Sequence, residues 1–239
     1  MGETVELNIL GLSIGFNVLI AMIATVLIVL GLCIYMTRNL SVDNPGKPQL
    51  ILEWLIDFTR GILQDSFGNT IPPAYLVIAL TLLMTIFVSN LLGLPFLVEA
   101  NGISYWKSPT ADLAVALTLS VLMNLISHFL GIRAYGLGQY FKVTYMTPNI
   151  LKLPISLVEE LINTLTLALR LFGNIFAGEV LLALIATAGN SFGVVTWLFG
   201  IPLEMVWQGF SLFIGAIQAY IFVTLSMVYL SEKVPEGQH

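Results

Sequence analysis

Five apolar runs, each long enough to cross a lipid bilayer, constrain the fold of this chain more than any other feature. A helix of about 20 apolar residues spans the roughly 30 Å hydrocarbon layer of a membrane. Hydrophobic residues make up 57% of the 239 residues and charged residues only 10%, a composition outside the range of soluble domains. The sequence therefore predicts an all-α polytopic membrane protein, with a single membrane domain over residues 1–239. The expected spans are residues 16–36, 74–98, 111–131, 153–188 and 195–230.

An amphipathic interfacial helix is expected between the first two spans, over residues 49–67. There, apolar residues such as Trp54 and Phe58 alternate with charged residues such as Glu53 and Asp57 at helical spacing. This pattern is typical of a helix that lies at a membrane surface. The charges disfavour a further full crossing, although a re-entrant hairpin formed with the second span also fits the pattern.

The basic residues are distributed unevenly between the loops, which predicts the orientation of the spans. Short cytoplasmic loops carry an excess of Lys and Arg. By this rule the N-terminal tail, residues 1–15, lies outside, and the C-terminal tail, residues 231–239, is cytoplasmic. The N-terminal tail has no basic residue and so does not look like a secretory signal. We therefore expect a retained first span and a bacterial plasma membrane, with an organelle-encoded protein as the alternative. The basic residues on the inner side are Arg38, Lys47, Arg60, Arg133, Lys142, Lys152 and Lys233, whereas only Lys107 falls in an outer loop.

Several kinds of site are not predicted. The net charge of −5 is spread thinly along the chain, so no nucleic-acid partner is expected. Gly46 and Lys47 lack the upstream glycine of a nucleotide-binding loop, so the chain should not bind ATP. No His, Cys or acidic cluster has the spacing of metal ligands, and no nucleophile–base pair is recognisable. We therefore expect no metal, no cofactor and no catalytic residue in this chain.

Arg170 places a charge in the middle of the fourth apolar run. A guanidinium cannot lose its charge by releasing a proton, and an arginine at the bilayer centre costs about 2.5 to 3.5 kcal/mol on insertion scales. Such a residue is a functional-site candidate. Its own helix offers no close partner, because Glu179 points to the opposite face and Glu159 lies more than about 15 Å along the axis. The neutralising charge is therefore expected on another subunit.

A polar stripe runs down the fourth span, and the fifth span has a similar polar edge. At about 100° per residue, the five residues of the stripe fall within about 40° of one line. Residues 155–188 contain no proline and would form a helix of about 51 Å, so this span must tilt or bend in a membrane. We expect the last two spans to pack as a long, tilted hairpin through a turn near residues 189–193. The stripe comprises Glu159, Asn163, Thr166, Arg170 and Asn174, and the edge comprises Glu204, Gln208, Ser211, Gly215 and Gln218.

These polar residues indicate two ion paths rather than one continuous pore. A fixed positive charge at the waist of a pore would be a barrier to cations. Two half-paths separated by Arg170 fit the pattern better, with a mobile carboxylate on a neighbouring subunit as the carrier. An arginine lowers the pKa of an adjacent carboxylate and so favours its deprotonated form. Glu179 and Glu204 are expected toward the outer side, and Glu159 and Glu160 toward the inner side.

One block of the fourth span resembles the signature of a known family. The run TLALRLFGNIFAGE, which begins at Thr166, is similar to the signature of subunit a of the F-type ATP synthase, the stator half of its membrane motor. The QAYIF run that begins at Gln218 resembles the final-helix motif of that family. The resemblance covers nearly the whole chain. Supporting matches are Glu53-Trp54, residues 89–95 (SNLLGLP) and residues 109–112 (PTAD).

The resemblance implies that Arg170 faces a rotating ring of c subunits and separates two proton half-channels, so that proton flow drives ring rotation and ATP synthesis. It also implies a b-subunit peripheral stalk and the rest of the ATP synthase complex as partners, within a lipid bilayer. Some relatives carry histidine at the position of Ser211, so the serine here leaves more of the proton transfer to Glu179. Taken together, the polar stripe, the polar edge and the resemblance predict these ion-translocation residues: Arg170, Glu179, Asn174, Gln218, Glu159, Ser211, Glu204 and Asn163.

Other interpretations are compatible with the same residues. The motor could be coupled to sodium rather than to protons. A self-contained secondary transporter, with Arg170 as a site for an anionic substrate, is the alternative function, and a membrane scaffold is a third. His128 is expected to be a hydrogen-bonded interhelical histidine rather than a proton relay. Asp112 and Asn90 are expected to be structural or to line an outer vestibule.

Overall fold

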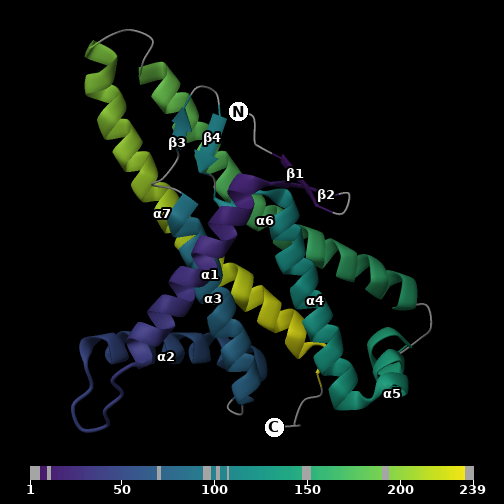
Figure 1. Cartoon of the computed structure of the whole chain (residues 1–239). Coiled ribbons are helices and arrows are strands. Elements are labelled where there is room, and N and C mark those ends of the chain that lie inside the picture. The colour runs from purple at the N-terminus through teal and green to yellow at the C-terminus, as the bar shows by residue number, and fades with distance from the viewer. Residues whose placement is uncertain are drawn as a thin grey trace. The chain divides into compact units, whose positions relative to one another are not determined.

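Long helices make up most of the structure (Figure 1). The computed structural model describes residues 6–9, 12–68, 71–93, 98–100, 103–106, 108–146, 152–189 and 194–234. Within these residues, five helices are long and apolar enough to cross a membrane, which confirms the predicted all-α polytopic class. They are α1 (Phe16–Thr37), α3 (Pro73–Gly93), α4 (Leu113–Tyr135), α6 (Lys152–Gly189) and α7 (Val194–Ser231).

The amphipathic helix between α1 and α3 is α2 (Lys47–Phe67). It has a proline in its first turn, where the missing N–H is not needed for an intrahelical hydrogen bond. The chain leaves the helix at Gly68, whose φ of 71° is accessible to glycine without steric cost. Asp57 and Arg60 form an exposed ion pair of 3.3 Å, whereas Leu63 is fully buried. The placement of α2 at a membrane interface stays a prediction.

The other described elements are short, and the sequence did not predict them. Segments of three to five residues are too short to show a hydrophobic period. The helix α3 ends at Gly93, whereas the apolar run continues to Val98, where a strand begins. Apolar composition does not distinguish a helix from a strand in so short a segment. These elements are η1 (Pro109–Ala111), α5 (Leu137–Phe141), the π-helical turn η2 (Lys142–Met146), and the antiparallel hairpins β1–β2 (Glu6–Ile9 and Leu12–Gly15) and β3–β4 (Val98–Ala100 and Ile103–Trp106).

The chain divides into two compact units, and each of the five long helices contributes residues to both. Some sequence expectations lie outside the described residues, namely the outer-loop position of Lys107, the turn that follows Gly189, and the ends of both tails. Unit 1 comprises Met1–Cys33, Met84–Ala116 and Arg170–Ala219, and unit 2 comprises Ile34–Leu83, Leu117–Leu169 and Tyr220–His239.

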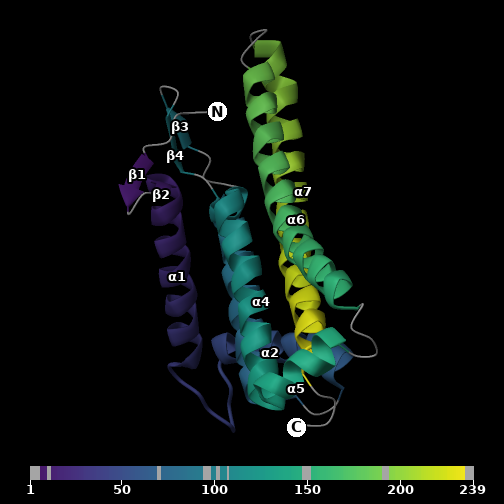
Figure 2. The same ribbon diagram turned by 90° about the vertical axis from the view of Figure 1, so that its right-hand side faces the viewer.

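In unit 1, α6 and α7 pack as an antiparallel pair, and these parts of the two helices lie side by side in both views (Figures 1 and 2). The Asn174 amide donates to Oε1 of Gln218 at 2.8 Å, and the Trp207 indole donates to the backbone oxygen of Gly178 at 3.3 Å. A Cβ atom at Gly178 would lie 3.4 Å from Oγ of Ser211, an ordinary van der Waals distance, so the two helices are in contact at this level. Ser211 and Gln218, which belong to the polar edge of α7, therefore face α6.

In unit 2, the segment that follows α7 packs closely against α4. A Cβ atom at Gly131 would lie 2.5 Å from Cε2 of Tyr140 and 2.6 Å from the backbone oxygen of Lys233. Both distances are shorter than carbon atoms tolerate in a packed interior. Tyr140 is only 1% exposed, so its ring has little room to move away. Glycine at position 131 therefore allows the C-terminal segment to reach α4.

Replacing Gly131 with alanine is expected to destabilise unit 2. The new methyl group must displace the Tyr140 ring and the backbone at Lys233, and overpacking of this kind costs about 1 to 3 kcal/mol. The measurement is thermal unfolding of the detergent-solubilised protein. Gly61→Ala in α2 is the matched control, because it makes the same change in a helix and an added Cβ there meets nothing within 4 Å. Equal melting temperatures for the two variants would contradict the close approach.

Candidate functional site

Arg170 lies in unit 1, half-buried on α6. Within the part of the chain that the structure describes, its guanidinium forms no hydrogen bond and no ion pair, with Glu159 and Glu179 included. The neighbouring residues on the same face leave it open: Ala177 is exposed, and a Cβ atom at Gly173 would meet nothing within 4 Å. The chain thus presents an uncompensated positive charge on a face lined by small residues.

Asn174 and Gln218 join α6 to α7 next to Arg170. Asn174 lies four residues, about one helical turn, beyond Arg170, and its Nδ2 donates to Oε1 of Gln218 at 2.8 Å. Gln218 is 2% exposed, whereas Asn174 is exposed. The hydrogen bond fixes the orientation of both amides. The structure therefore brings the predicted site residues Asn174 and Gln218 together, within about one helical turn of Arg170.

Glu179 is a buried carboxylate of unit 1, with 7% of its surface exposed. Its Oε1 accepts a hydrogen bond from the backbone N–H of Ser108 at 3.1 Å. The Ser108 hydroxyl contacts the Thr110 hydroxyl at 2.8 Å, and Thr110 donates to Oδ1 of Asn90 at 2.7 Å. The Asn90 amide donates in turn to the backbone oxygen of Gly215 at 2.9 Å. A continuous set of polar contacts therefore links Glu179 on α6 with η1, α3 and α7.

Two further predicted residues of α7 differ in their surroundings. Ser211 is 6% exposed, and its hydroxyl has no hydrogen-bond partner among the described residues. A buried hydroxyl without a partner costs about 1 to 3 kcal/mol, so this group has an unused capacity for hydrogen bonding. Glu204 is exposed and does not join the Glu179 contacts. Asn90, expected to be structural or to line a vestibule, holds α3 against α7.

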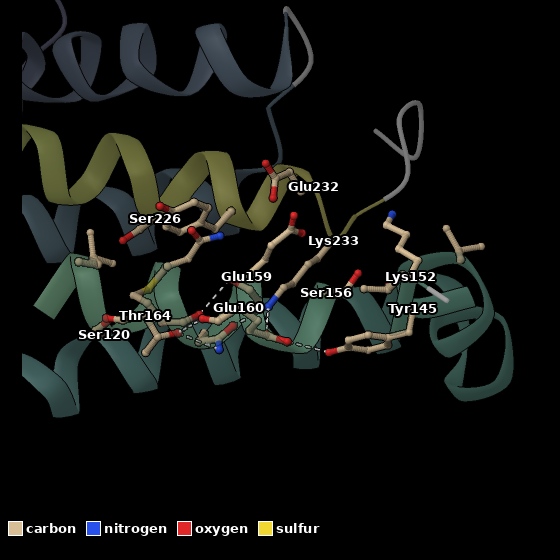
Figure 3. Close-up of a pocket in the computed structure, with 18 residues that line it drawn as sticks. Ser120, Tyr145, Lys152, Ser156, Glu159, Glu160, Thr164, Ser226, Glu232 and Lys233 are labelled. Carbon is tan, nitrogen blue, oxygen red and sulfur yellow. Dashed lines mark hydrogen bonds and ion pairs between the residues drawn. The ribbon is translucent and has the colours of Figure 1, made fainter. Parts of the chain in front are cut away.

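Unit 2 contains a cavity of about 470 Å³ whose walls carry both polar and apolar side chains (Figure 3). It is lined by parts of α4, η2, α6 and α7. The predicted residues Glu159 and Asn163 both line it, and Glu159 is exposed. Glu160, the neighbour of Glu159, is half-buried at the same cavity. The adjacent glutamates therefore have different environments, although the sequence placed them together as a pair.

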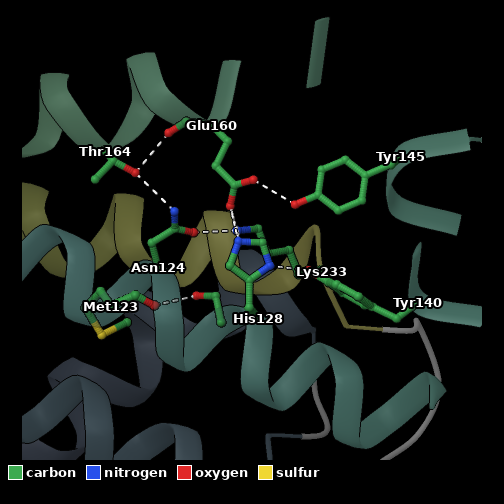
Figure 4. Close-up of polar contacts among 9 residues, drawn as sticks. Met123, Asn124, His128, Tyr140, Tyr145, Glu160, Thr164 and Lys233 are labelled. Atoms are coloured by element: carbon green, nitrogen blue, oxygen red, sulfur yellow. Dashed lines mark hydrogen bonds and ion pairs between the residues drawn. The ribbon is translucent and has the colours of Figure 1, made fainter. Parts of the chain in front are cut away.

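Glu160 of α6 is the centre of a polar cluster that joins it to residues of α4, α5, η2 and the segment that follows α7 (Figure 4). Its Oε1 accepts from the Lys233 ammonium at 2.5 Å and also pairs with Nε2 of His128. Its Oε2 accepts from the Tyr145 hydroxyl at 2.8 Å. The other ring nitrogen of His128 lies 2.6 Å from the Tyr140 hydroxyl. His128 thus has partners at both ring nitrogens, which agrees with a hydrogen-bonded histidine between helices.

Burial sets the protonation of the groups around this cluster. It raises the pKa of Tyr140 to about 12, with the Glu160 carboxylate adding to the increase. It also raises the pKa of Tyr145, and the hydrogen bond to Glu160 raises that pKa further. Burial lowers the pKa of Lys233, while the adjacent Glu160 carboxylate raises it. Both tyrosines therefore keep their hydroxyl protons at neutral pH.

Sequence reasoning missed Lys233 and Asn124 as parts of this cluster. Lys233 was used only as one of the basic residues that predict the inner side of the membrane. Its neighbours in the sequence do not distinguish it from the other basic residues. Asn124 and His128 lie four residues apart, which places them on one face of α4. That spacing was a usable signal for a polar face. The described residues contain no group of three or more His, Cys, Asp or Glu side chains able to hold a metal ion.

Proteins of known sequence are similar to this chain over nearly its full length. The family described as "ATP synthase A chain" matches residues 18–231. The "ATP synthase subunit a" of Staphylococcus saprophyticus is 48% identical over 237 residues, which cover 98% of this chain and 97% of that protein. The protein of that name from Listeria welshimeri is 45% identical over 237 residues, 99% of each chain. The Macrococcus caseolyticus protein is 49% identical over 212 residues, 89% of this chain and 87% of its own. With a family match over most of its length and relatives at this level of identity, the chain belongs to the ATP synthase subunit a family.

Proposed function

We propose that this chain is the stator subunit of a rotary ATP synthase motor, in which Arg170 separates two proton half-channels. The observation that carries the proposal is the open, uncompensated guanidinium of Arg170 on a face with Gly173 and Ala177. A charge of this kind needs a partner, and small residues allow another helix to approach closely. A ring of c subunits, each with a carboxylate within the membrane, supplies both the approaching helix and the charge.

Arg170 acts as an electrostatic gate in this mechanism. A nearby guanidinium lowers the pKa of an arriving ring carboxylate, which then releases its proton. The carboxylate passes the arginine in its charged form and takes up a new proton from the other half-channel. Because Arg170 has no competing carboxylate among the described residues of its own chain, it remains available to each ring subunit in turn.

Each unit of the chain supplies the polar residues of one half-channel. In unit 1 these are Glu179, Ser211 and the hydrogen-bonded pair of Asn174 and Gln218, with Glu204 nearer the entrance. The half-channel of unit 2 includes the cavity lined by Glu159, Glu160 and Asn163. The distribution of basic residues assigns the first half-channel to the outer side and the second to the cytoplasm. Protons driven inward by the membrane potential release about 2.3 kcal/mol per charge per 100 mV.

The chain performs this role as part of a complex in the bacterial plasma membrane. Its membership of the subunit a family and its five apolar helices support a multi-pass membrane component of the ATP synthase. The c-subunit ring and the b-subunit peripheral stalk are its proposed partners there. The N-terminus lies outside and the C-terminus is cytoplasmic. ATP is bound and made by other subunits.

Reconstitution of the chain alone tests the proposal against a self-contained transporter. Liposomes that contain only the purified subunit are expected to show neither proton flux nor uptake of small anions above the level of empty liposomes. Liposomes with the complete complex are expected to acidify on addition of ATP. Anion uptake by the chain alone would contradict the stator function and favour a transporter. The comparison works because a carrier for protons is present only when the ring is present.

A further inference from the structure

The ammonium group of Lys233 fills a place in unit 2 that has the character of a cation site. Its Nζ lies 2.5 Å from Oε1 of Glu160 and 2.5 Å from Oδ1 of Asn124 (Figure 4). Carboxylate and amide oxygens at about this distance are the ligands of hard metal cations. Nε2 of His128 completes the surroundings at 3.2 Å. The chain therefore places its own cation between two oxygens that could hold a metal ion.

Lys233 shares Oε1 of Glu160 with Nε2 of His128 and supplies the ammonium charge at this place. The side chain of Lys233 is 12% exposed and that of Glu160 is 18% exposed. A partly buried ion whose partner is removed is left uncompensated, which is strongly unfavourable. A carboxylate left behind in this way must take up either a proton or another cation. Removing Lys233 would therefore leave the Glu160 carboxylate with His128 and Tyr145 as partners but without the ammonium.

The same place opens on the cavity of unit 2 (Figure 3). Glu160, Asn124 and Lys233 all line this cavity, so an ion inside it can reach the carboxylate. Three other charged side chains, Glu159, Glu232 and Lys152, also line the wall. Their formal charges sum to one negative charge, which attracts cations into the cavity, so the ammonium of Lys233 is the group that keeps a further cation from Glu160.

We propose that Lys233 determines ion selectivity: its tethered ammonium excludes sodium and other metal cations from Glu160 and keeps the cavity of unit 2 a path for protons. The inference rests on the proposed function, because it assigns a specificity to the half-channel that contains the cavity. A proton needs only one oxygen atom and can bind to Glu159 while Lys233 stays in place. A metal ion needs several oxygens at once, and Lys233 holds the two that Glu160 and Asn124 offer.

Lys233→Ala is the variant that tests this role. The measurement is equilibrium binding of radioactive sodium to the purified, detergent-solubilised ATP synthase complex at mildly alkaline pH. The variant complex is expected to bind an additional sodium ion relative to the unmodified complex, since sites on other subunits are common to both. Equal sodium binding by the two complexes would overturn the inference. If Lys233→Ala fails to assemble, the same measurement is made on Lys233→Ser, whose hydroxyl can hydrogen-bond within the site.

Two further variants identify the source of any additional binding. Lys233→Arg keeps a cation at the site and is expected to bind no additional sodium. Combining Lys233→Ala with Glu160→Gln removes the anionic ligand together with the ammonium, and this double variant is also expected to bind no additional sodium. Additional sodium in either variant would show that the ion binds elsewhere and would overturn the assignment to Glu160.

Proton pumping by the same complexes separates this inference from the proposed function. Sodium is expected to lower ATP-driven pumping by Lys233→Ala by about half at the concentration that fills half of the sites. The unmodified complex is expected to pump equally well in sodium and in choline. If Lys233→Ala shows neither binding nor inhibition while Arg170→Ala abolishes pumping, the selectivity role fails and the stator function stands. Normal pumping by Arg170→Ala would instead contradict the stator function, whatever Lys233→Ala binds.

Discussion

Arg170→Ala is expected to lower the rate of proton-driven ATP synthesis by the assembled complex at least about 100-fold. This factor corresponds to roughly 2.7 kcal/mol in barrier height. Without the guanidinium, a protonated ring carboxylate can move directly between the half-channels, and the protonation step no longer enforces rotation. The measurement is ATP synthesis in membrane vesicles after an imposed proton gradient. Passive proton leak in the same vesicles is expected to rise, because the barrier between the half-channels is gone.

Arg60→Ala is the matched control for this experiment. Arg60 lies on the exposed side of α2, in an ion pair with Asp57, and such surface pairs contribute only about 0 to 1 kcal/mol. Its removal is expected to leave both synthesis and leak close to those of the unmodified complex. Arg170→Lys keeps the charge but lacks the planar array of donors of a guanidinium, so it should limit the leak better than alanine. Normal synthesis by Arg170→Ala, in a complex that contains the subunit, would remove the gating role.

Glu179→Gln is expected to lower proton-driven synthesis by at least about tenfold, which corresponds to roughly 1.4 kcal/mol. The glutamine oxygen can still accept the hydrogen bond from the backbone N–H of Ser108, so the fold of unit 1 is preserved. The amide cannot take up and release a proton at neutral pH. The buried Ser211 hydroxyl can donate and accept hydrogen bonds along the path, but it does not ionise at neutral pH and so cannot replace the carboxylate. The loss should therefore fall on proton transfer and not on assembly.

Passive proton flux is the sharper readout for Glu179. The flux is measured in vesicles from which the catalytic sector has been removed, so that it reports on the membrane path alone. Asp57→Asn makes the same chemical change at an exposed carboxylate of α2 and is expected to leave the flux unchanged. A flux in Glu179→Gln equal to that of the unmodified protein would place Glu179 outside the path and leave it with a purely structural role.

The long helices could be predicted from the sequence because membrane spans depend on one dominant property. Each needs about 20 apolar residues, and the five runs of this chain correspond to five helices of that length or more. The short hairpins and the π-helical turn η2 have no such property, and Tyr145 of η2 is held by a hydrogen bond to Glu160 of α6. The apolar run that ends at Val98 shows the difference, because its helical part stops at Gly93.

The candidate functional residues divide in the same way between local and distant signals. Arg170 could be singled out because a single charge in an apolar run is unusual wherever it lies. The pair of Asn174 and Gln218 could be predicted because each of two neighbouring helices carries a polar residue. The Glu160 cluster was different, because Lys233 lies 73 residues away from Glu160. No periodicity within one helix could show that these two charges meet.

The close approach at Gly131 also restricts how members of this lineage can diverge. Position 131 can accept a larger residue only after Tyr140 has become smaller or the backbone at Lys233 has moved, because both lie where the new side chain would be. Substitutions at these positions therefore have an order in which they can occur. The side chain of Lys233 carries the ammonium that contacts Glu160. A substitution at position 131 that moves the backbone of Lys233 would therefore alter the cavity of unit 2, although residue 131 does not line that cavity.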